Sequence, residues 1–233
     1  TLFNREELKP LFPILYSETF KKEPSLLSNK GRILVTFNIL NENKPVVLQW
    51  NNGEGIIFKK QIELDDKYLF KITQQVQNNT SNQIELFPYA QITRNKIPDD
   101  IQNFYISHEG FIGVFDEELK EDDYDDIEEK KIVREANKGW FGITDKYWMT
   151  ALIPKNGENF KSTFLYKDAF KANYILNKPT LISPSSSNTN EVRLFVAAKE
   201  VETIDAYAAN QNIEKLDLVI DWGWFYFFTK PLF

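Results

Sequence analysis

The alternation of apolar and polar residues along most of the chain predicts β-strands. Tyr68, Phe70, Ile72 and Val76 alternate with polar side chains between residues 68 and 77, which is the period-two pattern of a half-buried strand. The predicted strands cover residues 32–40, 56–64, 68–77, 83–93, 104–108, 111–115, 147–153, 159–166, 172–176, 180–183 and 191–197. Many short strands separated by polar turns favour an antiparallel sandwich or barrel.

Helical periodicity is confined to the C-terminal part of the chain. Val201, Ile204 and Ala208 lie on one face of a predicted helix that begins near residue 201. Pro88 indicates an edge or a bulge within its strand, and residues 183–190 (SPSSSNTN) are predicted to form a loop. We therefore expect a β domain over residues 1–200, a helical linker over 201–221 and, as an aromatic tail over 222–233, the start of an amphipathic interfacial helix.

The composition excludes several classes of function. The 233 residues carry a formal net charge of −6, which argues against a nucleic-acid partner because phosphate contacts need a basic surface. The absence of cysteine excludes disulfides, thiolate metal sites and cysteine nucleophiles, and a single histidine excludes a multi-histidine metal site. The sequence contains neither a signal peptide nor an apolar stretch of the ~20 residues that cross a bilayer.

The acidic segment at residues 116–129 has two interpretations. It contains ten carboxylates and one lysine. The carboxylates that could ligate calcium are Asp122, Asp123, Asp125, Asp126 and Glu128. The glycine and the ligand spacing of an EF-hand loop are missing, so we favour a solvated loop whose charges repel one another.

The sequence offers little support for catalysis. His108 and Glu109 could form an acid–base pair, but adjacent residues of a strand point to opposite faces. A structural histidine is the favoured interpretation. The sequence contains no nucleophile-elbow, P-loop, dinucleotide-binding or zinc-protease motif. We therefore predict a protein that is not an enzyme and that has no cofactor, catalytic residue or metal site.

Three aromatic residues lie close together around glycines in the middle of the chain. Trp140 lies within the GWFG segment, and Tyr147 and Trp148 follow it; these three residues could line a groove for a sugar or a peptide. Sandwich cores use tryptophan and glycine in the same way, and we favour this second interpretation.

The C-terminal end is unusually aromatic, since seven of its last twelve residues are Trp, Phe or Tyr. In a helix, Trp224, Phe228 and Leu232 would form one line at four-residue spacing. Trp and Tyr beside a lysine suit a membrane–water interface, and twelve helical residues would extend only about 18 Å, too short to cross the bilayer. The predicted membrane-interface residues are Trp222, Trp224, Phe225, Phe228, Lys230 and Leu232. The alternative is a helix that closes the domain's own core.

Four segments of the sequence resemble one known family. Residues 216–233 (LDLVIDWGWFYFFTKPLF) are similar to the end of the periplasmic domain of the YidC family, the bacterial inner-membrane protein insertases. Residues 138–154 (KGWFGITDKYWMTALIP), 108–116 (HEGFIGVFD) and 193–207 (RLFVAAKEVETIDAY) fit the same family in the right order. The resemblance covers essentially the whole chain and is weakest over the first thirty residues.

This resemblance implies a fold and a setting. The fold is a β-supersandwich domain over residues 1–200, similar to galactose mutarotase, followed by short α-helices. The domain would lie on the periplasmic side of the inner membrane of Gram-negative bacteria, between the first and second transmembrane segments. The chain begins without methionine and ends within an apolar run, so we expect it to be a fragment of a longer protein.

The resemblance also implies partners. The family inserts and folds inner-membrane proteins, alone or with the Sec translocon, and its substrate groove belongs to a transmembrane core that has no counterpart in this chain. The expected role is accessory, with contacts to that core, to SecD and SecF, to nascent inner-membrane proteins and to the membrane surface. The alternatives are a carbohydrate-binding or mutarotase-like sugar-active protein, and a periplasmic chaperone platform with an exposed apolar groove.

Overall fold

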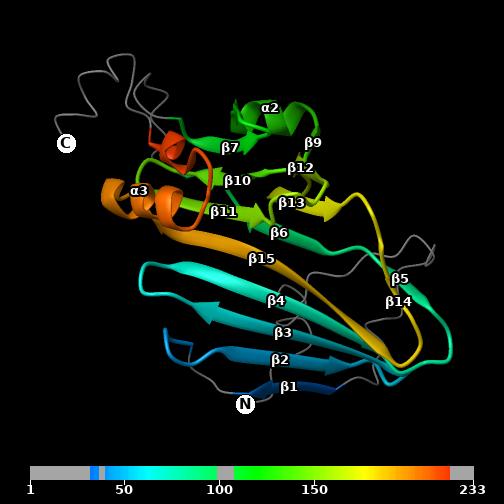
Figure 1. The fold of residues 1–233 in the computed structure, drawn as a ribbon. Helices are drawn as coiled ribbons and strands as arrows, with labels where there is room; N and C mark the ends of the chain where they lie inside the picture. Colours follow the sequence, from blue (N-terminus) through cyan, green and yellow to red (C-terminus); the bar gives the residue numbers. More distant parts are fainter. Residues whose placement is uncertain (1–31, 37–39, 99–107, 221–233) are drawn as a thin grey trace. The chain divides into compact units, whose positions relative to one another are not determined.

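The computed structural model describes residues 32–36, 40–98 and 108–220, which belong to two compact units. Unit 1 combines Thr1–Gln91 with Tyr174–Leu194, and unit 2 combines Ile92–Asn173 with Phe195–Phe233. Strands β6 (Tyr89–Arg94), β13 (Phe170–Leu176) and β15 (Ser186–Ala198) run from one unit into the other. Each unit is described by itself below (Figure 1).

The main sheet of unit 1 is antiparallel, with the order β1-β2-β3-β4-β15. Its strands besides β15 are β1 (Arg32–Thr36), β2 (Val46–Asn51), β3 (Ile56–Leu64) and β4 (Leu69–Asn78). The register places Phe58 opposite Trp50 on β2 and Val76 on β4. The Trp50 and Phe58 rings stack at 5.2 Å, which is the kind of cross-strand aromatic pair that stabilises a sheet.

A second, two-stranded sheet completes the core of unit 1. It pairs β5 (Ile84–Leu86) with β14 (Thr180–Ile182). Leu86 and Ile182 from this sheet pack with Ile56 and Val76 from the main sheet in one buried cluster. The fully buried Asn78 amide donates hydrogen bonds to the carbonyls of Asn82 (2.8 Å) and Ile182 (3.0 Å), so its polar atoms are satisfied.

The first sheet of unit 2 has the order β15-β11-β10-β7-β8. Its strands besides β15 are β7 (Gly110–Phe115), β8 (Glu118–Asp122), β10 (Gly139–Thr144) and β11 (Trp148–Pro154). Glycine is required at position 142, because a Cβ there would lie 1.9 Å from the backbone oxygen of Thr150. This glycine lets β10 and β11 approach closely.

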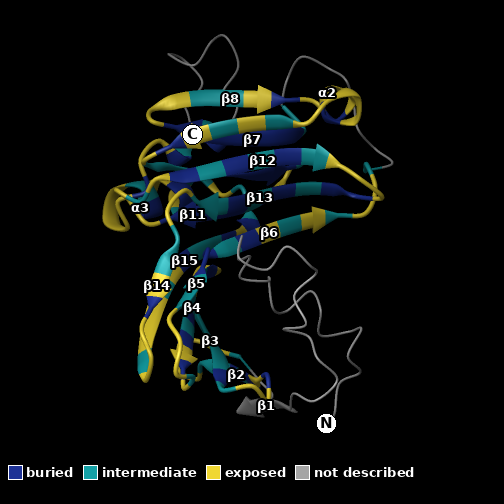
Figure 2. Ribbon diagram, turned by 90° about the vertical axis from the view of Figure 1, so that its right-hand side faces the viewer, coloured by how far each residue is buried: buried dark blue, intermediate teal, exposed yellow. Residues whose placement is uncertain are grey.

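The second sheet of unit 2 packs face to face on the first. It has the order β6-β13-β12-β9, with β12 (Phe160–Tyr166) and β9 (Ile132–Ala136). Figure 2 shows buried residues alternating along β12 and β13. Phe164 on β12 lies 4.9 Å from Phe111 and 5.9 Å from Phe141 between ring centroids, so a phenylalanine cluster forms the sandwich core.

Helices cover the opposite face of the first sheet. Helix α3 (Val201–Asn210) and the 3-10 helix η3 (Leu216–Val219) contact each other. The Tyr207 ring of α3 packs edge-on against Phe195 of β15 at 5.7 Å, and Leu216 is fully buried. Among the described residues, none of the helices is long and apolar enough to span a membrane.

The structure confirms several predicted elements and corrects three. Residues 56–64 form β3, and the predicted helix is α3. The single strand predicted over residues 83–93 is divided at Pro88 into β5 and β6. The prediction of a loop over residues 116–129 is wrong, because the segment forms β8 and helix α2 (Tyr124–Glu129), which buries Tyr124 and Ile127. The predicted loop at 183–190 is also wrong beyond Ser185, because β15 begins at Ser186.

Other predictions lie outside the described residues. Most of the strand predicted at 104–108 falls in the segment 99–107, and the tail at 222–233 falls in the segment 221–233. The division into a β domain at 1–200, a linker and a tail stays a prediction.

Candidate functional site

The β10–β11 hairpin presents two of the three candidate groove aromatics at its tip, residues 145–148. Tyr147 is 64% exposed and Trp148 is 62% exposed. Trp140, near the start of β10, is fully buried, and its indole Nε1 donates a hydrogen bond to the Glu214 carbonyl at 3.1 Å. The structure therefore makes Trp140 a core residue and leaves Tyr147 and Trp148 at the surface.

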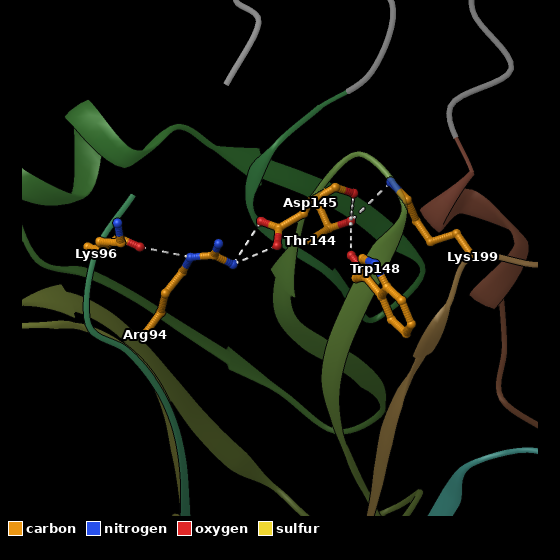
Figure 3. Close-up of polar contacts among 6 residues, drawn as sticks. All are labelled: Arg94, Lys96, Thr144, Asp145, Trp148 and Lys199. Carbon is orange, nitrogen blue, oxygen red and sulfur yellow. Dashed lines mark hydrogen bonds and ion pairs between the residues drawn. The ribbon is translucent and has the colours of Figure 1, made fainter. Parts of the chain in front are cut away.

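An ion pair holds the hairpin tip to strand β6 (Figure 3). Arg94 Nη1 lies 2.8 Å from both carboxylate oxygens of Asp145. Arg94 Nε also donates a hydrogen bond to the Lys96 carbonyl at 3.0 Å. The two charged side chains are only 27% and 26% exposed, so the pair is shielded from water more than an ordinary surface pair.

Hydrogen bonds also hold the tip on the side of β15 and α3. The Asp145 N–H donates to the Trp148 carbonyl at 2.8 Å, and the Lys199 N–H donates to the Tyr147 carbonyl at 2.8 Å. Lys199 Nζ donates to Thr144 Oγ1 at 3.2 Å. In Figure 3, Arg94 and Lys199 reach the hairpin from opposite sides. The tip is therefore a fixed turn that displays two exposed rings.

The charges next to the exposed rings are mostly positive. Lys146 is exposed, and its Nζ lies 5.2 Å from the centroid of the Tyr147 ring, within cation–π range. Lys96 is exposed and Lys199 is half-buried. The one carboxylate within the tip belongs to Asp145, and it is paired with Arg94.

A buried tyrosine lies close to this ion pair. Tyr124 is 3% exposed, and its hydroxyl has no hydrogen-bond partner among the described residues. Burial raises the pKa of Tyr124 well above its usual range; Arg94 lowers this pKa by a smaller amount, and Asp145 raises it further. The hydroxyl is therefore neutral at physiological pH.

The carboxylates of the acidic segment contact protein groups. Asp122 accepts two hydrogen bonds from Arg134, at 2.7 and 2.8 Å. Asp116 accepts the N–H groups of Asn137 (2.9 Å) and Lys138 (3.2 Å). In the described part of the chain, His, Asp and Glu residues do not gather into any group of three or more that could hold a metal ion.

The single histidine has a local structural role. His108 Nε2 lies 2.9 Å from the Phe111 carbonyl, and a carbonyl only accepts, so this nitrogen carries the hydrogen. Nδ1 lies 3.5 Å from the Asp123 carboxylate. This arrangement agrees with the favoured interpretation of His108 as a structural residue.

The sheet packing places this protein in a class of β-sandwich folds. A solved structure of a galactose mutarotase related enzyme from Lactobacillus acidophilus is similar over 72% of this chain and 73% of that chain, with a TM-score of 0.51 and 10% sequence identity. At this identity the likeness shows the fold alone. The predicted fold class, a mainly β supersandwich similar to galactose mutarotase, is confirmed.

The sequence comparisons define the family. The family model of the YidC periplasmic domain matches residues 31–233. A membrane protein insertase YidC from Pelagibacter ubique is 48% identical over 84% of this chain and 35% of its own length. A membrane protein insertase YidC from Cereibacter sphaeroides is 39% identical over 83% of this chain and 34% of its own length.

The chain belongs to the YidC periplasmic domain family, as its four sequence segments predicted. It spans about a third of the length of the curated relatives that it matches.

Proposed function

We propose that this chain is the accessory periplasmic domain of a YidC-type membrane protein insertase, and that it acts without enzymatic turnover. The observation that carries the proposal is the family match over residues 31–233, together with relatives named membrane protein insertases. The domain would lie on the periplasmic side of the inner membrane. Its partners would be the transmembrane core of the same protein, SecD, SecF and the Sec translocon, and nascent inner-membrane proteins.

We further propose that residues 222–233 anchor the domain at the membrane surface, with Trp222, Trp224, Phe225 and Phe228 among the lipid headgroups. The way the preceding residues pack supports this role. Leu216 and Val219 of η3 are buried, and the Trp140 indole binds the backbone just before them at Glu214. The chain therefore reaches residue 220 from a fixed point on unit 2, and an anchor beyond it would hold that unit.

Vesicle flotation tests the anchor. On vesicles of phosphatidylcholine alone, chains with Trp222, Trp224, Phe225 and Phe228 changed to serine should lose the flotation that the natural chain shows. The matched control is Tyr68→Ser, which removes an aromatic ring that is 62% exposed in the β3–β4 turn and should leave flotation unchanged. Equal flotation of the natural and tail-altered chains on these vesicles would contradict the anchor proposal.

Co-purification tests the accessory role. The full-length insertase, with and without residues 31–220, would be isolated from membranes and probed for SecD and SecF. Loss of both partners on deletion is the expected result, and undiminished recovery would contradict their contact with this domain.

The sugar-active alternative rests on fold likeness, which is weak evidence for function. Calorimetric titration with hexoses and oligosaccharides should give no saturable binding. Saturable binding would replace the accessory role with the carbohydrate one.

A further inference from the structure

We propose that the tip of the β10–β11 hairpin, residues 145–148, is a second membrane-contacting site. Tyr147 and Trp148 would enter the headgroup layer, and the exposed Lys146 would face anionic phospholipid. The proposal goes beyond the anchor because it uses none of residues 222–233.

The first argument is that the exposed rings are held in place. Tyr147 and Trp148 are adjacent and are 64% and 62% exposed, although aromatic side chains are normally the main contributors to cores and interfaces. Backbone hydrogen bonds of 2.8 Å join Asp145 to Trp148 and Lys199 to Tyr147. A turn held by these hydrogen bonds displays the rings at the surface, and it would lose little conformational freedom when they are buried.

The second argument is local charge. The chain as a whole has a net charge of −6, yet the tip carries Lys146 and lies beside Lys199. Its own carboxylate, Asp145, is neutralised by Arg94 at 2.8 Å. The nearby acidic residue Glu200 contacts Thr203 Oγ1 at 3.3 Å, on the side of α3. Within residues 145–148, Lys146 is therefore the charge left for anionic headgroups to attract.

The third argument concerns the kind of occupant. A stable protein interface buries about 800 Å² on each partner, whereas the tip offers two rings on one turn between charged side chains. Trp and Tyr next to lysine are the residues that settle at a membrane–water boundary, because each ring has an apolar body and a polar edge. The geometry thus favours a lipid surface over a protein partner.

A site-specific label tests the proposal cleanly, because the natural chain contains no cysteine. A polarity-sensitive fluorophore would be attached to Tyr147→Cys and, as a control, to Tyr68→Cys, whose native ring is 62% exposed. The vesicles would contain either phosphatidylethanolamine with phosphatidylglycerol or phosphatidylcholine alone. We expect a blue shift at position 147 with the anionic vesicles only, and no shift at position 68.

Unlabelled variants supply the affinity. The double variant Tyr147→Ser/Trp148→Ser should bind anionic vesicles at least about tenfold more weakly than the natural chain, with an unchanged Tm because both rings are exposed. Lys146→Glu should weaken binding in low salt and have less effect in high salt.

The outcomes separate this proposal from the tail anchor. A shift at position 147 that persists when the tail aromatics are serine supports the hairpin site, even if the tail proves not to bind. No shift at position 147, equal shifts at positions 147 and 68, or a shift that depends on the tail would overturn it. A shift that appears with SecD and SecF in the vesicles but not with lipid alone would assign the tip to a protein partner and would also overturn it.

Discussion

Breaking the Arg94–Asp145 pair should measure how firmly the hairpin tip is held. The perturbation is Arg94→Met, which keeps an unbranched apolar side chain but leaves the Asp145 carboxylate without its 2.8 Å partner. Fully exposed pairs contribute about 0.2–1 kcal/mol, whereas removing one member of a buried pair costs about 3–5 kcal/mol. With side chains 27% and 26% exposed, we expect a loss of about 1–2 kcal/mol.

Urea and thermal unfolding would measure that loss. For a chain of this size, about 1–2 kcal/mol corresponds to a Tm lower by about 2–8 °C. A double-mutant cycle with Asp145→Asn should give a coupling of about 1 kcal/mol, since the two side chains share one interaction. Arg94→Lys should restore only part of the stability, because lysine cannot also reproduce the Nε hydrogen bond to Lys96.

The Arg134–Asp122 pair provides the internal comparison. It is less exposed, at 20% and 9%, and two guanidinium nitrogens contact the carboxylate. Arg134 also lies over the Phe115 and Phe164 rings, at 5.5 and 5.6 Å. Arg134→Met should therefore cost about 3–5 kcal/mol. Equal losses for the two arginine variants, or a larger one for Arg94→Met, would refute the argument from burial.

Three further predictions concern stability. Gly142→Ala should lower the free energy of unfolding in urea by about 3 kcal/mol or more, because the added Cβ would lie 1.9 Å from the Thr150 backbone oxygen. Gly157→Ala is the control: its Cβ would meet nothing within 4 Å, so the φ of +86° should lower the free energy of unfolding by only about 1 kcal/mol. Burial lowers the pKa of Lys60 from 10.5 to about 7, so the unfolded chain binds more protons between these values and stability should rise with pH across that window. Lys60→Met should remove this rise and stabilise the protein most below pH 7; an unchanged pH profile would contradict the assignment. Tyr124→Phe should leave the Tm unchanged or raise it by removing an unpaired buried hydroxyl, and a clear drop in Tm would show that the hydroxyl is bonded.

Local sequence patterns were enough to predict elements such as strand β3 and helix α3. Residues 56–64, which follow the glycine-containing turn at 51–55, were predicted as a strand, and β3 has the same bounds in the structure. Helix α3 begins at Val201, where the apolar spacing changes to that of a helix. In both cases the local preference and the packing agree.

The sequence-based predictions failed where a contact with a residue distant in the sequence determines the local structure. The acidic segment suggested a solvated loop, but Asp122 is neutralised by Arg134, twelve residues away. The spacing of Tyr124 and Ile127, which are both buried in α2, was the available signal for a helix. Similarly, the fixed hairpin tip depends on Arg94, 51 residues from Asp145. The sequence placed Trp140, Tyr147 and Trp148 in one group, and only the pairing of the strands separates the buried ring from the exposed ones.

The interleaved path of the chain through unit 1 has a consequence for biosynthesis. In its main sheet β4 pairs with β15. The Asn78 amide likewise hydrogen-bonds to the Ile182 carbonyl, which is synthesised 104 residues later. At ribosomal rates of about 5–20 residues per second, this interval lasts roughly 5–20 s. During that time β4 is an open edge with unpaired backbone groups, which is a template for aggregation. The β4 edge therefore stays open until β15 has been made, and slowing elongation between β4 and β15 should increase aggregation of the nascent chain.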